Sequence, residues 1–263
     1  MQALSLAAGR VAARTAGAGP TIVLLHSLLA DAASCVPLAH RLAPRMRPVV
    51  LDLPGFGGSA PVAGDLAAIA DRVADAIADL DCPHPPILFG NGYGSFIALL
   101  IAINRPGLVS RLVLAGTGAA FSPPGRAAFA AMANAAAARG LAAVADTAMT
   151  RLFAPDFQEA NPTLIAERRT AFLATDPAVF AQACAALEQL DLTTEATTLR
   201  LPVLIVTGAQ DAATPPAMAS NLAARIPGAQ FTLLDACAHV PQLQDPARFL
   251  AAIESFIAPA TVA

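Results

Sequence analysis

The sequence predicts an α/β fold in which helices flank a mostly parallel central sheet, with a helical cap inserted near the middle of the chain. Short aliphatic runs alternate with helical patterns on both sides of a stretch without strands. Such alternation is typical of parallel sheets with right-handed crossovers. With 263 residues, 56% of them hydrophobic and 13% charged, the chain is long and apolar enough to bury one large core.

Each expected element follows from a local pattern. Short runs of three to six mostly β-branched, aliphatic or aromatic residues predict buried strands. Apolar residues spaced three or four apart, as in the stretch from Leu66 to Leu80, predict amphipathic helices. The strands are expected at 21–26, 48–51, 87–89, 111–115, 203–206 and 231–234, and the helices at about 35–43, 65–80, 95–104 and 246–257.

The middle of the chain differs from both ends. Residues 119–198 are rich in alanine, helical in pattern and interrupted by prolines, with no convincing strand. We interpret them as a helical cap over the carboxyl edge of the sheet, and residues 1–118 and 199–263 as the α/β core. A separate all-helical domain is the alternative, and the matching strand patterns on both sides favour one core.

Composition argues against several function classes. The net charge is −3 and no basic cluster is present, so we expect no nucleic-acid partner. The apolar run 96–103 is far too short to span a bilayer, and residues 1–14 lack the pattern of a signal peptide, so we expect a cytoplasmic protein without a membrane partner. The oligomeric state cannot be inferred from these features.

The cysteines do not form a recognisable site. Cys35, Cys82, Cys184 and Cys237 show no CxxC spacing, and no histidines cluster around them. This arrangement favours reduced, mostly buried thiols over a zinc site or a disulfide framework. We expect no bound metal.

Several motifs occur in an order that resembles the α/β-hydrolase fold superfamily, in particular its small esterases, enol-lactonases and C–C-bond hydrolases. No single motif is specific, but together in this order they are. They are His26-Ser27 after a strand, Asp52-Leu53-Pro54-Gly55-Phe56-Gly57-Gly58-Ser59, Phe89-Gly90-Asn91-Gly92-Tyr93-Gly94, Thr207-Gly208-Ala209-Gln210-Asp211 with Pro215, and Cys237-Ala238-His239.

The resemblance implies a nucleophile elbow at 90–94, a strained turn from strand to helix that needs small residues on both sides. Gly90 and Gly94 are those small residues, and Gly92 occupies the nucleophile position. Glycine has no side chain, so the usual acyl-enzyme cannot form at residue 92. Asp211 and His239 match the family's acid and base.

The resemblance also implies an oxyanion hole. Its expected donors are the backbone N–H of Tyr93 and that of Ser27 or Leu28. His26, which begins the loop with Ser27 and Leu28, is expected beside them among the substrate-binding residues. The Ser27 hydroxyl, where the family carries glycine, either donates to a substrate oxygen or caps the loop.

Other reactive side chains are expected to have structural roles. Ser95 matches a small residue of the helix, Cys237 a small residue beside the histidine, and the Tyr93 phenol the pocket wall. His40 and His84 are expected at the surface. Asp52 is expected to organise its own loop.

Three interpretations of the glycine remain open. In the first, His239, oriented by Asp211, acts directly as a general base on water or on an acidic substrate proton. In the second, the chain is an inactive protein that binds a small ligand or a partner. In the third, it is an ordinary serine hydrolase whose nucleophile was replaced by glycine.

One observation would decide against a nucleophile-free site: a serine or cysteine within hydrogen-bond reach of His239. We predict a hydrolase-like enzyme acting on a small, mostly apolar carbonyl compound such as an ester, lactone or diketone. The apolar cap residues Met132, Met149, Phe129, Phe153, Phe157 and Phe172 suggest this substrate. The resemblance implies no organic cofactor.

Overall fold

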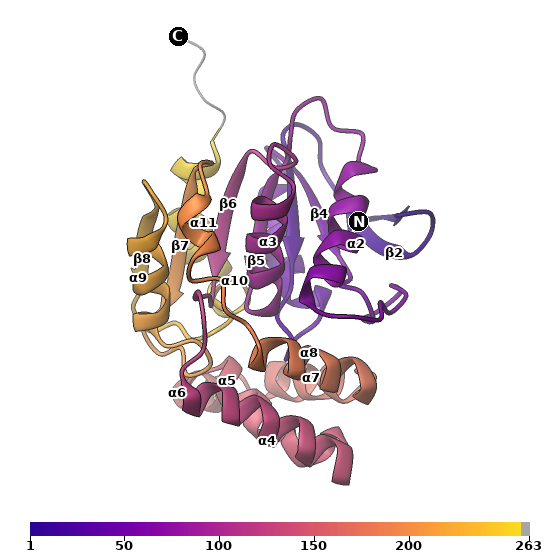
Figure 1. Ribbon diagram of the computed structural model, residues 1–263. Coiled ribbons are helices and arrows are strands. Elements are labelled where there is room, and N and C mark those ends of the chain that lie inside the picture. The colour runs from indigo at the N-terminus through magenta and orange to yellow at the C-terminus, as the bar shows by residue number, and fades with distance from the viewer. Residues whose placement is uncertain (259–263) are drawn as a thin grey trace.

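The computed structural model describes residues 1–258, which form one eight-stranded sheet in the order β1-β2-β4-β3-β5-β6-β7-β8 (Figure 1). β1 and β2 pair antiparallel, as do β2 and β4, and every other pairing is parallel. The strands are β1 (Gln2–Leu6), β2 (Val11–Thr15), β3 (Thr21–Leu25), β4 (Arg47–Leu51), β5 (Ile87–Asn91), β6 (Arg111–Ala115), β7 (Val203–Gly208) and β8 (Gln230–Leu234).

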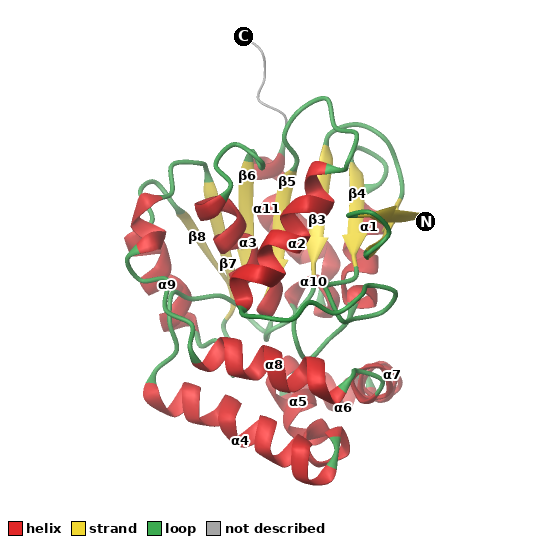
Figure 2. Cartoon of the chain, turned by 45° about the vertical axis from the view of Figure 1, so that its right-hand side comes forward, coloured by secondary structure: helices red, strands yellow, loops and turns green. Residues whose placement is uncertain are grey.

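Helices cover both faces of the sheet, and a helical layer lies beyond one end of it (Figure 2). The core helices are α1 (Val36–Leu42), α2 (Leu66–Ala78), α3 (Tyr93–Asn104), α9 (Pro216–Arg225), α10 (Pro241–Gln244) and α11 (Pro246–Ile257). The inserted helices are α4 (Pro123–Arg139), α5 (Ala145–Leu152), α6 (Pro155–Ala160), α7 (Pro162–Leu173) and α8 (Pro177–Glu188).

The buried strands explain the two covered faces. Successive side chains of a strand point to opposite faces, so β3 supplies both apolar layers. Val23 and Leu25 pack in the layer that contains α2, α3 and α9, whereas Ile22 and Leu24 pack in the layer that contains α1 and α11. A strand buried on both sides has no polar face, which is why the sequence shows unbroken aliphatic runs here.

Strand order determines where a ligand site can form. The chain leaves β3 to reach β4 on one side, and later returns to β5 on the other side of β3. In open α/β sheets, ligands bind at the carboxyl ends of the strands where the order reverses in this way. Ser27 follows β3 and Gly92 follows β5, so both lie at this reversal.

The inserted helices lie over that same edge. Figure 2 shows α4 to α8 gathered beyond the arrowheads of β3 and β4. An ion pair between Arg168 of α7 and Asp31, 2.7 Å from Nη1 to Oδ1, joins this layer to the loop after β3. Among the described residues, no single helix is long and apolar enough to cross a bilayer; α7 and α8 reach that length only together, with a 94° bend between them.

The main differences from the sequence-based expectation lie at β1, β2, α9 and the short α10, which it did not include. The turn between β1 and β2 contains Ala7, Ala8 and Gly9, with φ of 51°, 55° and 82°. Alanine rarely adopts positive φ, so no residue pattern marked this hairpin. The other strands and core helices begin and end within a few residues of the predicted positions.

Candidate active site

The bend between β5 and α3 lies at Gly92, whose φ and ψ are 54° and −118°. Only glycine adopts such a conformation without strain. The flanking glycines permit the close approach of neighbouring backbone. A Cβ on Gly90 would lie 2.3 Å from the carbonyl oxygen of Gly94, and one on Gly94 would lie 2.7 Å from the Cβ of Leu25. The elbow is thus built at the residues that the sequence indicated.

Asp211 and His239 form a buried hydrogen-bonded pair, with 2.9 Å between Asp211 Oδ2 and His239 Nδ1. Asp211 also accepts hydrogen bonds from the backbone N–H groups of Ala213 and Thr214 and from the Thr214 hydroxyl. These donors fix the carboxylate. Since Nδ1–H donates to Asp211, Nε2 of His239 carries the free lone pair and acts as an acceptor.

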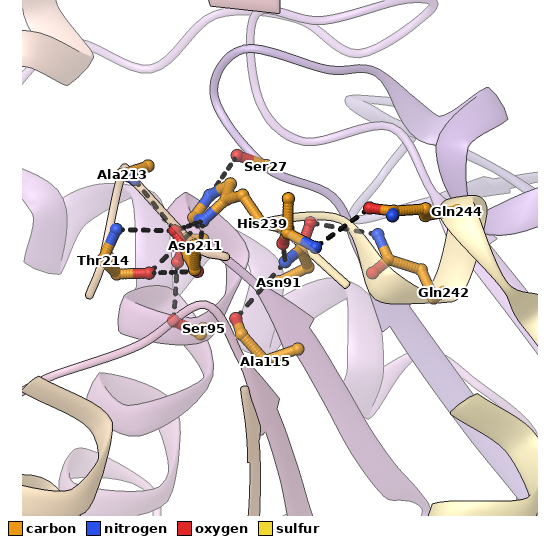
Figure 3. Close-up of polar contacts among 12 residues, drawn as sticks. Ser27, Asn91, Ser95, Ala115, Asp211, Ala213, Thr214, His239, Gln242 and Gln244 are labelled. Atoms are coloured by element: carbon orange, nitrogen blue, oxygen red, sulfur yellow. Dashed lines mark hydrogen bonds and ion pairs between the residues drawn. The ribbon is translucent and has the colours of Figure 1, made fainter. Parts of the chain in front are cut away.

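The backbone of His239 is held in place as well (Figure 3). Asn91, the residue before the bend, donates from Nδ2 to the carbonyl oxygen of His239 at 2.8 Å, and Gln242 donates to Asn91 Oδ1 at 3.0 Å. On the other side, the N–H of His239 donates to the carbonyl oxygen of Leu152 in α5 at 3.2 Å. The inserted helices therefore contact the histidine directly.

Ser27 occupies the space in front of the elbow. Its Oγ lies 3.2 Å from His239 Nε2, within hydrogen-bond distance. A Cβ built on Gly92 would lie 2.5 Å from this Oγ and 2.7 Å from Nε2. Ser27 Oγ thus stands where a side chain at residue 92 would begin. The described site contains a serine–histidine–aspartate chain of hydrogen bonds whose serine comes from the β3 loop.

Two backbone amides adjoin this serine. The N–H groups of Leu28 and Tyr93 donate to no other group among residues 1–258, and both residues line the same cavity. Tyr93 is the first residue of α3, where the helix dipole favours negative charge. These amides are available to an oxyanion.

The cavity between the elbow and the inserted helices measures about 30 Å³. That volume accommodates roughly one or two water molecules, less than an ester substrate occupies. Its polar lining is Ser27, Thr214, His239 and Arg151, and its apolar lining includes Leu28, Leu29, Phe96, Phe121, Phe129 and Leu187.

His26 was expected among the substrate-binding residues, but it does not line the cavity. The ring is fully buried outside the cavity lining; Nδ1 donates to the carbonyl oxygen of Ser27 and Nε2 accepts from the N–H of Leu53. Both ring nitrogens are occupied by main-chain groups. The residue therefore holds the loop that carries Ser27 and has no ring nitrogen free for a further hydrogen bond.

The remaining candidates have the structural roles expected of them. Ser95 Oγ donates to the carbonyl oxygen of Gly92 at 2.6 Å, inside the protein. Asp52 accepts from the N–H of Gly58 within its own loop. His40 and His84 are exposed.

The thiols are equally inert. All four cysteines are unpaired, and all but the half-buried Cys82 are buried. Burial raises the pKa of Cys35 and of Cys184 to about 12 and also raises the pKa of Cys237. Cys237 does not line the cavity, so it supplies no nucleophile there. Residues 1–258 contain no group of three or more side chains able to hold a metal ion.

Two side-chain features of the cavity were not predicted. Arg151, at the end of α5, faces the cavity with no hydrogen bond or ion pair to any described residue. The Tyr93 hydroxyl is buried without a hydrogen-bond partner. A lone arginine in an alanine-rich helix gives no sequence signal, and the phenol was expected only to line the wall.

Comparison with known proteins agrees with this geometry. Residues 22–252 match the model of a family described as "Alpha/beta hydrolase family". The chain is 30% identical over 210 residues to 3-oxoadipate enol-lactonase 2 of Acinetobacter baylyi, covering 79% of this chain and 77% of that protein. It is 28% identical to a pimeloyl-[acyl-carrier protein] methyl ester esterase of Aeromonas hydrophila, covering 92% and 96% of the two chains.

Solved structures of an enol-lactonase and an esterase have the same fold as this chain. The enol-lactonase from Burkholderia xenovorans LB400 superimposes with a TM-score of 0.88 and 26% identity, over 97% of this chain and 99% of that one. A thermophilic esterase from Thermogutta terrifontis superimposes with a TM-score of 0.87 and 25% identity, over 98% of both chains.

Proposed function

The chain belongs to the alpha/beta hydrolase family, and from that premise we propose that it hydrolyses a small ester or lactone at the site around Gly92. One observation carries the proposal: a buried histidine, oriented by an aspartate through Nδ1, turns its Nε2 toward the elbow, 3.2 Å from a serine hydroxyl oxygen. Relatives named as an enol-lactonase and a methyl ester esterase support this choice of substrate class.

In the proposed mechanism Ser27 is the nucleophile. His239 Nε2 takes the Oγ proton as Oγ forms a bond to the carbonyl carbon, and the N–H groups of Leu28 and Tyr93 stabilise the resulting oxyanion. Collapse breaks the ester C–O bond, and the leaving alcohol takes the proton from His239. Water, deprotonated by the same Nε2, then attacks the acyl group on Ser27, which leaves with the proton and completes the hydrolysis.

The contact of Ser27 with His239 is the observation expected to count against a nucleophile-free mechanism, which is therefore the alternative that the test has to exclude. Here a water in the cavity beside the bare Gly92 would be deprotonated by His239 and attack the substrate directly. The cavity volume of about 30 Å³ supports it. Ser27 is favoured because its Oγ already lies within hydrogen-bond distance of Nε2, where the attacking water would have to be.

The test uses a panel of p-nitrophenyl esters and small lactones with the wild-type protein and matched variants. We expect turnover by the wild type, at least 10³-fold lower kcat/KM for His239→Ala and Ser27→Ala, and unchanged activity for the exposed His40→Ala control. Retained activity in Ser27→Ala together with loss in His239→Ala would establish the water mechanism instead. No turnover in any substrate screen would contradict the proposal and favour a binding protein.

A further inference from the structure

Arg151 is an unneutralised charge in a site built largely of apolar side chains. Its guanidinium lies 5.7 Å from the centroid of the Phe129 ring, and no described acidic side chain lies within ion-pair distance of it. Burial lowers its pKa, which reflects the cost of a charge removed from water. The Phe129 ring offsets part of that cost by attracting the positive charge, but it does not accept hydrogen bonds from the five guanidinium N–H groups as an anion would.

Tyr93 provides an independent second observation. The residue is 2% exposed and is one of those that line the same cavity as Arg151, and its hydroxyl is buried without a hydrogen-bond partner. Both side chains also lie within electrostatic range of the Cys184 thiol. A buried hydroxyl without a partner is uncommon and is typical of a position that a ligand completes.

We propose that Arg151 and the Tyr93 hydroxyl bind a carboxylate of the substrate, so that the preferred substrates are esters or lactones that carry a free acid group. This inference rests on the proposed function and names its substrate class. The guanidinium supplies charge and paired N–H donors, and the phenol supplies one further donor. The apolar side chains that line the same cavity would contact the methylene chain of such a compound.

Arg151 and Tyr93 are each next in sequence to a residue that contacts or forms the proposed reaction site. Leu152, the next residue, accepts the backbone hydrogen bond of His239, and Tyr93 directly follows the elbow. The two proposed carboxylate donors are therefore covalent neighbours of groups that frame the site. A carboxylate bound to them would hold the ester at a defined distance from Ser27 Oγ.

The charges around Arg151 argue against an internal partner. Asp211 raises its pKa from a distance, but that carboxylate is already occupied by His239, Thr214 and two backbone N–H groups. The Cys184 thiol is neutral because burial raises its pKa to about 12. A purely structural role, in which Arg151 only complements the α5 dipole and covers Phe129, is the competing explanation.

The experiment compares monomethyl esters of the C4 to C6 dicarboxylic acids with their dimethyl esters, measured as methanol release at pH 7.5. We expect wild-type kcat/KM to favour the best monoester at least tenfold over its diester. Arg151→Met should lower kcat/KM for the monoester roughly 10- to 100-fold, mainly through KM, with little change for the diester. Tyr93→Phe should show the same selective loss to a smaller degree.

Arg139→Met is the matched control, since this arginine is exposed in the same helical layer. Equal losses for monoester and diester in Arg151→Met, or no monoester preference in the wild type, would overturn the inference while leaving ester hydrolysis intact. If no ester is hydrolysed, binding of glutarate is measured by calorimetry. Binding to wild type that is lost in Arg151→Met supports the carboxylate site even then, and no binding overturns it.

Discussion

Replacing Gly92 by alanine tests the contact between the elbow and Ser27. The added Cβ would lie 2.5 Å from Ser27 Oγ, 2.7 Å from His239 Nε2 and 3.0 Å from Ser27 Cβ, closer than Cβ atoms normally approach. The residue would also keep a φ of 54° and ψ of −118°, where a side chain is strained. Both effects act on the folded state alone.

The magnitude follows from these two effects. A non-glycine residue in a sparsely populated backbone region costs about 1–3 kcal/mol, and overpacking a buried site costs a similar amount. We expect Gly92→Ala to lower the free energy of unfolding by about 2–6 kcal/mol. For a chain of 263 residues, this corresponds to a Tm roughly 4–11 °C lower.

A double-mutant cycle that combines Gly92→Ala with Ser27→Gly isolates the contact between the added Cβ and Ser27 Oγ. The free energy of unfolding of each protein is measured with urea. Removing the Ser27 side chain leaves the backbone strain of Gly92→Ala but relieves the contact to Oγ. The cost of Gly92→Ala should then be at least about 1 kcal/mol smaller in the Ser27→Gly background. Additivity within about 0.5 kcal/mol would refute the placement of Ser27 Oγ in front of the elbow.

Three further predictions concern the same region. Adding Gly92→Ser to Ser27→Gly should restore ester hydrolysis by the usual route, with more activity than Gly92→Ser alone; equal activities would contradict the steric conflict. Burial lowers the pKa of His26 below 6.5 in the folded protein, so the unfolded chain binds the proton at a higher pH than the folded one. The free energy of unfolding should therefore fall as the pH drops below 6.5 toward the folded-state pKa. Urea unfolding should show a weaker pH dependence in this range for His26→Gln than for the wild type, and identical profiles would exclude this residue as a cause. In the native protein, Cys82 should react first with a thiol reagent, because the other three cysteines are buried; rapid labelling of Cys184 would contradict its burial.

Much of the fold could be predicted because buried parallel strands leave a strong local pattern. The run from Thr21 to Leu25 is buried at every position, so its residues are aliphatic on both faces. In the edge hairpin, β1 is mostly exposed and β2 is buried only at alternate residues, and the turn between them contains alanines. This weak pattern was missed. Helix α9 was missed as well; its polar face gives only a modest periodic signal.

Some residues of the site could likewise be located from the sequence, and others could not. Gly92, Asp211 and His239 could be located because each follows a strand in a fixed motif order. The contact of Ser27 Oγ with His239 Nε2 could not be predicted, because it depends on the distance between two loops that are 212 residues apart in sequence.

The supporting residues depend on tertiary structure still more strongly. Asn91 and Gln242 hold the backbone of His239 through contacts between distant segments. Arg151 reaches the cavity only because α5 docks against His239. No local pattern encodes these contacts. A cytoplasmic location and the absence of a cofactor stay predictions.

The most direct test of the proposed chemistry is to locate the covalent adduct formed with a fluorophosphonate, which traps activated serines. Peptide mass spectrometry of the wild-type protein should place a single adduct on Ser27, with no adduct in Ser27→Ala and much slower labelling in His239→Ala. An adduct on another residue, or hydrolysis of esters by a protein in which Ser27 is never labelled, would contradict the assignment of Ser27 as the nucleophile.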